Sequence, residues 1–443
     1  MKIERIFTKA KSGPFKDIAW ERRKSEIRNP DGKAIFSEPC VIVPSFWSQI
    51  ATDIIAQKYF RKAGVPRDKI YAWKEWSPDM GGADPGMELP EDGAEHDARQ
   101  VFHRLAFTWM DWARKNGYFD SAEDEKAFYD ETCYMLAHQM AAPNSPQWFN
   151  TGLYAVYGID GPAQGHYYFE SAEGKVKKSD SAYERPQVHA CYILSIQDDL
   201  VNEGGIMDLV TREARLFKYG SGTGSNFSRV RAINERLSGG GVSSGLLSFL
   251  KIGDRSASAI KSGGTTRRAA KMVTLDADHP DVEKYIAWKQ DEEHKVVSMV
   301  TGSLIVKKHF EGIKRALAMF RGPEADKFNA EKNRDLAAAL RHALADKIQP
   351  SYLYQLLRRL EQGDEAIKLP VFSTAWDDEA YNTVSGQSSN NSLRFSDDFM
   401  KAVQDDGDWN LNGRVTGKIE KTIKARKIWN EAARSAWACA DPG

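Results

Sequence analysis

The chain has 443 residues and a formal net charge of zero, because 62 lysines and arginines balance 62 aspartates and glutamates. Its hydrophobic fraction of 41% and aromatic fraction of 11% exclude a disordered chain, and its 34 glycines and 17 prolines are too few for a collagen-like protein. Zero net charge also disfavours broad binding to nucleic acids or anionic membranes, so recognition of anions must come from local loops.

Residues 1–143 are predicted to form a mainly helical domain. They begin with MKIERIFTKAKSGPF, which has no apolar leader, and no long uncharged apolar run occurs anywhere in the chain. We therefore expect a cytoplasmic protein without a membrane span. Helices are expected over 47–61, 101–115 and 123–139, the last ending before Pro143.

Residues 144–443 are predicted to form an α/β domain, which opens with a turn over 144–150 and a hairpin between His166 and Lys175. Strands are then expected over 188–196, 269–275 and 296–306, and helices over 206–218, 244–260 and 281–288. This alternation favours a parallel sheet. A charged helical insertion is expected over about 308–362, and a last helix over 425–438.

Two glycine-containing segments are candidates for binding a nucleotide. The first segment is 218–229, where alternating glycines could take positive φ angles and turn backbone N–H groups toward an anion. Its candidate binding residues are Lys218, Gly220, Ser221, Gly222, Gly224 and Asn226. The second, 261–268, combines cations with hydroxyls; its candidates are Ser262, Gly263, Gly264, Arg267 and Arg268. The first segment lacks P-loop spacing and follows a helix, so a plain tight turn is its alternative, and a solvated basic turn is the alternative for the second.

The four cysteines, Cys40, Cys133, Cys191 and Cys439, are far apart and form no cluster with histidines, so no metal site is expected. Cys191 lies in the apolar run VHACYILSI, where a buried structural thiol is the default. His189 in the same run is interpreted as a core histidine.

Three further residues have an ordinary structural interpretation and a functional one. Ser145 could bind a ligand or serve as a turn or N-cap oxygen. Asp198 and Asp199 follow a strand end, where α/β proteins place binding loops, but such aspartates are more often caps.

Seven segments together resemble one family, the adenosylcobalamin-dependent, class II ribonucleotide reductases. They are PSFWSQIATDIIAQKYFRKAGVP, APNSPQWFNTGLY, ACYILSIQDD, FKYGSGTGSNFSRVRA, SGGTTRRAAKMVTLDADHPDVEKYIAWK, GQSSNNSLRFSDDFMKAV and WACADPG. The resemblance covers nearly the whole chain and implies a helical N-terminal domain followed by the first part of a ten-stranded α/β barrel. It also implies that ribonucleoside diphosphates are reduced to 2′-deoxyribonucleoside diphosphates for DNA synthesis, by a thiyl radical that adenosylcobalamin initiates.

The resemblance assigns roles to particular residues. Cys191 corresponds to the first of two cysteines that are oxidised to a disulfide during turnover, and Ser145, Ala190, Cys191 and Gly222 correspond to substrate contacts. The segments 218–229 and 262–268 correspond to the two specificity loops. Asp198 and Arg231 correspond to residues that hold a deoxynucleoside triphosphate effector at a homodimer interface, although Ser238 stands where a related class has another arginine, close to Arg236. A thioredoxin-type protein is implied as the reductant.

One departure from the family concerns the Asn-x-Cys-x-Glu segment that carries the radical cysteine, which this sequence lacks. We therefore expect the chain to be the N-terminal portion of a reductase, inactive without its missing C-terminal half. A non-catalytic nucleotide-binding remnant is the alternative. A class I large subunit is a further alternative, which NSPQWFNTGLY and the insertion over 154–185 disfavour.

Overall fold

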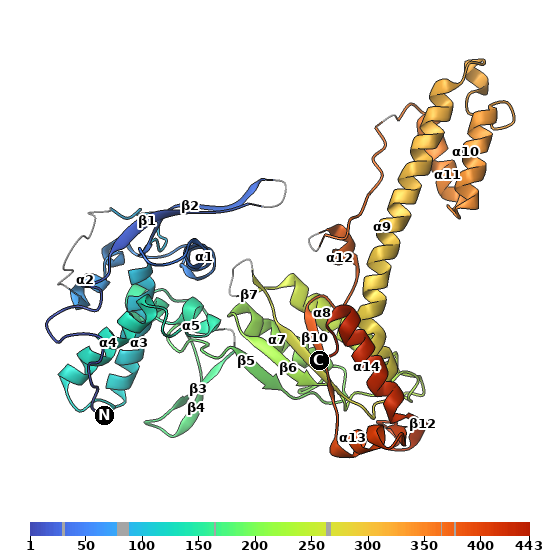
Figure 1. The fold of residues 1–443 in the computed structure, drawn as a ribbon. Helices are drawn as coiled ribbons and strands as arrows, with labels where there is room; N and C mark the ends of the chain where they lie inside the picture. The colour runs from blue at the N-terminus through green and yellow to red at the C-terminus, as the bar shows by residue number, and fades with distance from the viewer. Residues whose placement is uncertain (29–31, 78–87, 164, 263–266, 365, 376–377) are drawn as a thin grey trace. The chain divides into compact units, whose positions relative to one another are not determined.

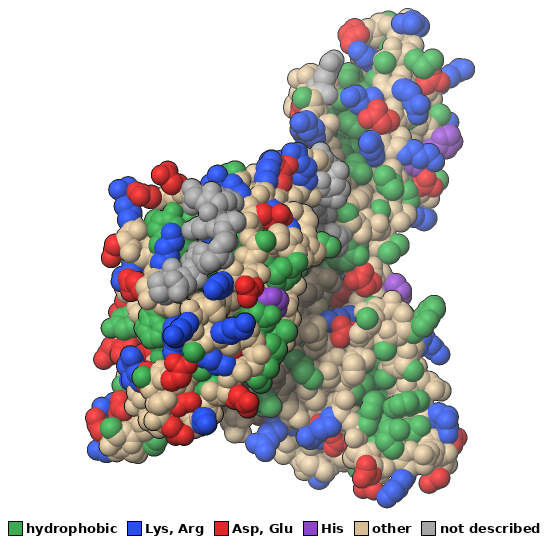
Figure 2. Space-filling model, turned by 60° about the vertical axis from the view of Figure 1, so that its left-hand side comes forward, with side chains coloured by type: hydrophobic (Ala, Val, Ile, Leu, Met, Phe, Trp, Pro, Cys, Tyr) green, Lys and Arg blue, Asp and Glu red, His purple; other side chains and the backbone are tan. Residues whose placement is uncertain are grey.

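The computed structural model describes residues 1–443 except 29–31, 78–87, 164, 263–266, 365 and 376–377 (Figure 1). The chain divides into two compact units, Met1–Val230 with Arg255–Thr274, and Arg231–Asp254 with Leu275–Gly443. In the described part of the chain, no helix has the length and apolar character needed to span a membrane. Acidic and basic side chains are interspersed over the face seen in Figure 2, as expected from the balanced charge.

The first unit begins with an antiparallel hairpin that the sequence analysis did not predict. It consists of β1 (Trp20–Arg28) and β2 (Ala34–Pro44), and Val41, Ile42 and Val43 of β2 are fully buried. Hydrophobic and β-branched residues in the second half of β2 fit a strand that packs on helices. The N-terminal domain therefore has a β element as well as its helices.

Helices pack against this hairpin, and their bounds are α1 (Gln49–Ile54), α2 (Trp73–Trp76), α3 (Ala98–Lys115) and α4 (Ala122–Ala137). The two long helices confirm the prediction, and both have strong caps: Asp97 forms a capping box with Gln100, and the Ser121 side chain accepts the Asp124 N–H. The single helix expected over 47–61 is wrong in detail, because α1 gives way to a π-helical turn over Ile55–Tyr59.

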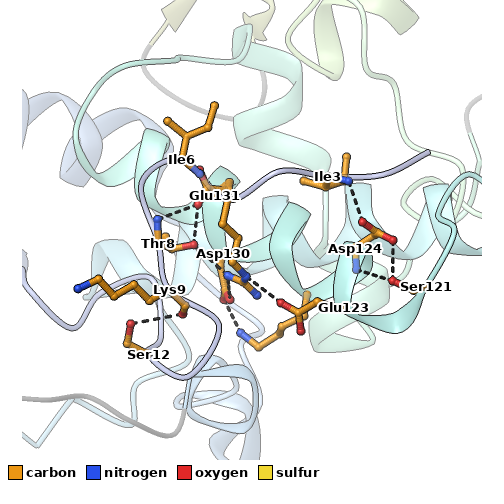
Figure 3. A network of polar contacts seen from close by, with 12 residues as sticks. Ile3, Ile6, Thr8, Lys9, Ser12, Ser121, Glu123, Asp124, Asp130 and Glu131 are labelled. Carbon is orange, nitrogen blue, oxygen red and sulfur yellow. Dashed lines mark hydrogen bonds and ion pairs between the residues drawn. The ribbon is translucent and has the colours of Figure 1, made fainter.

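The N-terminal segment is held against α4 by a polar network (Figure 3). The Glu131 carboxylate accepts the backbone N–H groups of Phe7 at 3.0 Å and Thr8 at 2.8 Å, and the Thr8 hydroxyl at 2.6 Å. Arg5 donates to Asp130 at 2.9 Å. Burial alone would raise the pKa of Glu131, but these hydrogen bonds outweigh it and hold the pKa below its usual value.

Short elements lead from α4 to the sheet: α5 (Ser145–Asn150), α6 (Leu153–Tyr157), β3 (Tyr167–Glu170) and β4 (Lys175–Lys178). The hairpin prediction is confirmed, since β3 and β4 pair antiparallel. The turn expected over 144–150 is instead a short helix, which Pro146 in its first turn favours. Asn144 rather than Ser145 is its N-cap, because the Asn144 side chain accepts the Gln147 N–H.

The parallel sheet confirms the α/β prediction. Its strand order is β10-β9-β6-β5, and β5 (Cys191–Leu194), β6 (Gly222–Asn226) and β9 (Lys271–Asp276) run parallel. The connecting helices are α7 (Ile206–Lys218) and α8 (Leu246–Ala259), and a short ladder of β7 (Lys261–Ser262) and β8 (Arg267–Arg268) precedes β9. In the second unit, the end of β9 lies next to β10 (Ser389–Arg394), where the Ala277 N–H donates to the Arg394 carbonyl oxygen.

The second unit is built around α9 (Val282–Met319), a continuous helix of 38 residues. The strand predicted over 296–306 is therefore wrong. Val296, whose β-branched side chain favours a strand, instead packs as a helical residue against Ala380 and Val384. Tertiary packing overrides local propensity here, and no proline interrupts the helix.

The other elements of this unit are α10 (Arg334–Ala345), α11 (Pro350–Glu361), α12 (Glu379–Thr383), α13 (Asp397–Gln404), β11 (Asp408–Asn412), β12 (Ile419–Lys424) and α14 (Ala425–Cys439). The helical insertion expected over 308–362 contains the end of α9 with α10 and α11 alongside it (Figure 1). Ile313 of α9, Leu336 of α10 and Leu353 of α11 share one apolar cluster.

Candidate functional site

The candidate site lies in the first unit, where β5 and β6 begin. Cys191 and Gly222, the first residues of these strands, are register partners. The Gly222 N–H donates to the Ala190 carbonyl oxygen at 2.5 Å, and the Ser221 hydroxyl donates to the His189 carbonyl oxygen at 2.6 Å. These bonds hold Ala190, Cys191 and Gly222 side by side.

Helix α5 is tied to the same strand ends by asparagine side chains. Asn144 donates to the Val188 carbonyl oxygen at 3.1 Å, and Asn150 donates to the carbonyl oxygens of Gln187 at 3.0 Å and Tyr219 at 2.9 Å. Ser145 follows Asn144 directly, so the four predicted substrate contacts, Ser145, Ala190, Cys191 and Gly222, belong to one cross-linked region. The Ser145 Oγ lies 3.4 Å from the Tyr59 hydroxyl.

Gly220 occupies a position that requires glycine. Its φ of +91° is left-handed, and a Cβ there would lie 2.5 Å from Cδ2 of Phe149, which is carried by α5. Beside it, Tyr219 is buried, and this burial together with the nearby Tyr183 raises the pKa of Tyr219 to about 12. The turn from α7 into β6 is therefore shaped around Phe149.

The expectation of positive φ angles along the whole glycine segment is wrong for Gly222 and Gly224. Both lie within β6, because residues 222–226 pair with strands on either side. Their lack of a side chain matters for close packing, since a Cβ on Gly222 would lie 3.1 Å from the Ala270 carbonyl oxygen. At the two ends of the segment, Lys218 is exposed and the Asn226 Oδ1 accepts the Ser228 N–H at 2.8 Å.

The structure corrects the expected burial of Cys191 and His189, both of which are exposed. The reason is that β5 is the edge strand of the sheet, and Ile193 on the same strand is 95% exposed. Cys40 and Cys133 are buried, and burial raises the pKa of both thiols. Of these three thiols, Cys191 is the one that is accessible to solvent.

Behind the site lies a buried arginine that the sequence analysis missed. Arg104 of α3 is 1% exposed and donates to the carbonyl oxygens of Trp148 at 2.8 Å and Thr151 at 2.9 Å, at the end of α5. It also pairs with buried Glu95 at 2.8 Å. The sequence does contain one indication of this burial: Arg104 is a charged residue on the apolar face of the predicted helix, between Val101 and Leu105.

Only the two ends of the second predicted segment are described, and these only in their backbone. Ser262 pairs with Arg267 in the antiparallel ladder of β7 and β8, and Arg268 pairs with Lys261. Gly263 and Gly264 lie outside the described residues.

The two predicted effector residues belong to different units, Asp198 to the first and Arg231 to the second. Asp198 is half-buried after the end of β5, and the Arg231 Nη1 donates to the Arg236 carbonyl oxygen at 2.9 Å. The neighbouring Asp199 is not the N-cap of α7, which is Gly205; its side chain instead accepts the N–H groups of Val201 at 2.9 Å and Asn202 at 2.7 Å in the turn that follows.

Comparisons with known proteins point to one family. Residues 21–139 match the family model described as "Class II vitamin B12-dependent ribonucleotide reductase", and residues 189–443 match "Ribonucleotide reductase, barrel domain". The chain is 54% identical over 455 residues to a vitamin B12-dependent ribonucleotide reductase of Agrobacterium fabrum, and 54% identical over 451 residues to one of Bradyrhizobium diazoefficiens. Both alignments cover 100% of this chain but 36% of the relative, so the chain spans about a third of the length of these relatives.

A shorter match connects the chain to a relative with a more specific name. Over 113 residues, 25% of this chain and 14% of the relative, it is 40% identical to a vitamin B12-dependent ribonucleoside-diphosphate reductase of Thermoplasma acidophilum.

Proposed function

Because this chain belongs to the class II, vitamin B12-dependent ribonucleotide reductases, we propose that it forms part of an enzyme that reduces ribonucleoside diphosphates to 2′-deoxyribonucleoside diphosphates in the cytoplasm. The choice of diphosphate is supported by the name of the Thermoplasma relative. The observation that carries the proposal is the pairing of the exposed Cys191 with Gly222, beside Ala190, in a region to which Asn144 ties the start of α5, the helix that carries Ser145. The match to a class II N-terminal model argues against a class I large subunit.

Adenosylcobalamin is the cofactor of this class, and when bound it supplies the radical that starts the reaction. Among the described residues, no group of three or more histidine, cysteine and carboxylate side chains lies where it could hold a metal ion directly.

We assign the reducing step to Cys191. Its thiol donates a proton to the 2′ hydroxyl of the ribose, which leaves as water. Two electrons come from Cys191 and a second cysteine; the proton of the second thiol ends as the new hydrogen on C2′, and the two sulfur atoms join in a disulfide. The resemblance places the second cysteine outside this chain, and a thioredoxin-type protein would reduce the disulfide again.

The remaining chain supplies binding and regulation in this proposal. Ser145 presents a hydroxyl to the substrate, and residues 218–229 and 262–268 act as specificity loops. Asp198 and Arg231 hold a deoxynucleoside triphosphate effector at the interface of a homodimer. By itself, the 443-residue chain is expected to bind nucleotides without turning them over.

The test is a Cys191→Ser variant of an enzyme in which this chain is completed by the remaining residues of the Agrobacterium relative. Deoxynucleotide production with adenosylcobalamin and thioredoxin should fall at least about 1,000-fold, because a hydroxyl cannot form the disulfide, while binding of the diphosphate should stay within about threefold. The matched control is Cys439→Ser, at a half-buried cysteine that should tolerate the change.

Multiple turnover by the Cys191→Ser enzyme would refute the assignment. Nucleotide binding without turnover in every completed enzyme would favour the alternative, a non-catalytic nucleotide-binding protein.

A further inference from the structure

Besides the pair of Arg104 and Glu95, the first unit has a buried ion pair between α7 and the sheet, next to Thr223, the residue that follows Gly222 on β6. Glu213 of α7 and Lys271, the first residue of β9, are each 1% exposed, and the Lys271 ammonium donates to the Glu213 Oε1. The same Oε1 accepts the Thr223 hydroxyl of β6 at 3.0 Å. One carboxylate oxygen therefore joins a helix to two neighbouring strands, on which Thr223 and Lys271 are register partners.

This junction lies between the two predicted specificity segments. Thr223 belongs to the first segment, 218–229, and α7 leads directly into that segment. Lys271 follows the β7–β8 ladder, Lys261–Ser262 paired with Arg267–Arg268, after only two alanines. Both segments are thus attached to Glu213 through short stretches of backbone.

An apolar contact reinforces the same connection. Phe217, one turn after Glu213 on α7, shares a buried cluster with Ala257 near the end of α8 and Ala269 directly after β8. Helix α7 also contacts β7. Close packing of this kind transmits a displacement rather than absorbing it.

The junction is not arranged for stability alone. Among the described residues, the Glu213 Oε2 and the Ser225 Oγ are buried and have no hydrogen-bond partner. A buried polar atom without a partner destabilises the folded state, and a buried ion pair can often be replaced by apolar residues without loss.

We infer that Glu213, Lys271 and Thr223 are positioning residues that couple segment 218–229 to the β7–β8 ladder, so that a change in one segment moves the other. The regulatory meaning of this coupling, in which a nucleotide at one segment alters the other, rests on the proposed function. The coupling itself does not, and it can be measured without a ligand.

The experiment is a double-mutant cycle on the 443-residue chain, with hydrogen–deuterium exchange as the measurement. Gly220→Ala perturbs the first segment at a known place, since its Cβ would meet the Phe149 ring. Exchange is then followed in peptides that contain Arg267 and Arg268, which Gly220 does not adjoin in sequence. The coupling predicts that Gly220→Ala changes exchange there at least about threefold.

In a Glu213→Leu/Lys271→Met background, the same Gly220→Ala change should alter exchange at β8 by less than about 1.5-fold, because the polar junction is gone. The matched control background is Asp208→Leu/Arg212→Met, which removes a partly exposed ion pair on the same helix and should leave the threefold effect intact. Melting temperatures are measured for every variant. If the Glu213→Leu/Lys271→Met variant does not fold, the Glu213→Gln variant is used as the background in its place.

Three results would overturn the inference: no effect of Gly220→Ala on β8 in the unmodified chain, an undiminished effect in the Glu213→Leu/Lys271→Met background, or an equal loss in the control background. A separate arm adds dTTP to the unmodified chain. Failure of dTTP to slow exchange in either segment would count against the proposed effector site but would leave the measured coupling standing.

Discussion

Replacing Arg104 with glutamine is expected to destabilise the first unit strongly. The guanidinium is 1% exposed, pairs with fully buried Glu95 and donates to the carbonyl oxygens of Trp148 and Thr151. Removing one partner of a buried pair costs about 3–5 kcal/mol, because the other charge stays buried without compensation. For a unit of roughly 250 residues, a loss of this size lowers the melting temperature by about 6–20 °C.

The assay is thermal and urea unfolding followed by circular dichroism, with Arg114→Gln as the control. Arg114 lies on the same helix, but its side chain is 45% exposed and its partner Asp111 also pairs with Lys115, so its loss should cost no more than about 1 kcal/mol. A Glu95→Leu/Arg104→Met variant should recover part of the loss, because no charge is then left unpaired. A cost below about 1 kcal/mol for Arg104→Gln, or one equal to that of Arg114→Gln, would refute the reasoning.

Three further predictions concern accessible thiols, the N-terminal segment and the effector. Iodoacetamide should label Cys191 in the native chain well before Cys133, whose burial raises its pKa; peptide mapping that found Cys133 labelled first would contradict the exposure. Because the pKa of Glu131 is lower in the folded chain than its usual 4.5, its stabilisation is present above about pH 4.5 and is lost as the pH falls through the folded value. Glu131→Gln should therefore speed trypsin cleavage of the first ten residues at pH 7, whereas Glu125→Gln should not. Asp198→Ala should weaken dTTP binding to the dimeric enzyme by about 1–3 kcal/mol in equilibrium dialysis, and unchanged affinity would remove Asp198 from the effector site.

Elements with strong local signals are predictable from the sequence. The long helices α3 and α4 follow from apolar spacing that coincides with capping residues such as Asp97 and Ser121. The alternation of helices and strands after Val188 indicates a parallel sheet, and the order of several motifs along the chain indicates the reductase family. Each of these signals lies within a short stretch of chain.

The tertiary structure decided which of the predicted residues are accessible. Cys191 lies in an apolar run that indicates burial, yet it is exposed because its strand forms the edge of the sheet. The apolar residues around Val296 indicate a strand, yet they continue α9 because distant side chains pack on that helix. Burial depends on neighbours that are remote in sequence, which local spacing does not contain.

The same reason explains the buried charges. Glu213 and Lys271 are 58 positions apart, and nothing in the residues around either one indicates that the other will neutralise it. A charged side chain is ordinarily expected at the surface, because burying it without a partner is costly. The sequence by itself determined the family, the long helices and the parallel arrangement of strands. Only the folded chain, by bringing opposite charges and edge strands into their final surroundings, decided which groups support the site and which can reach a ligand.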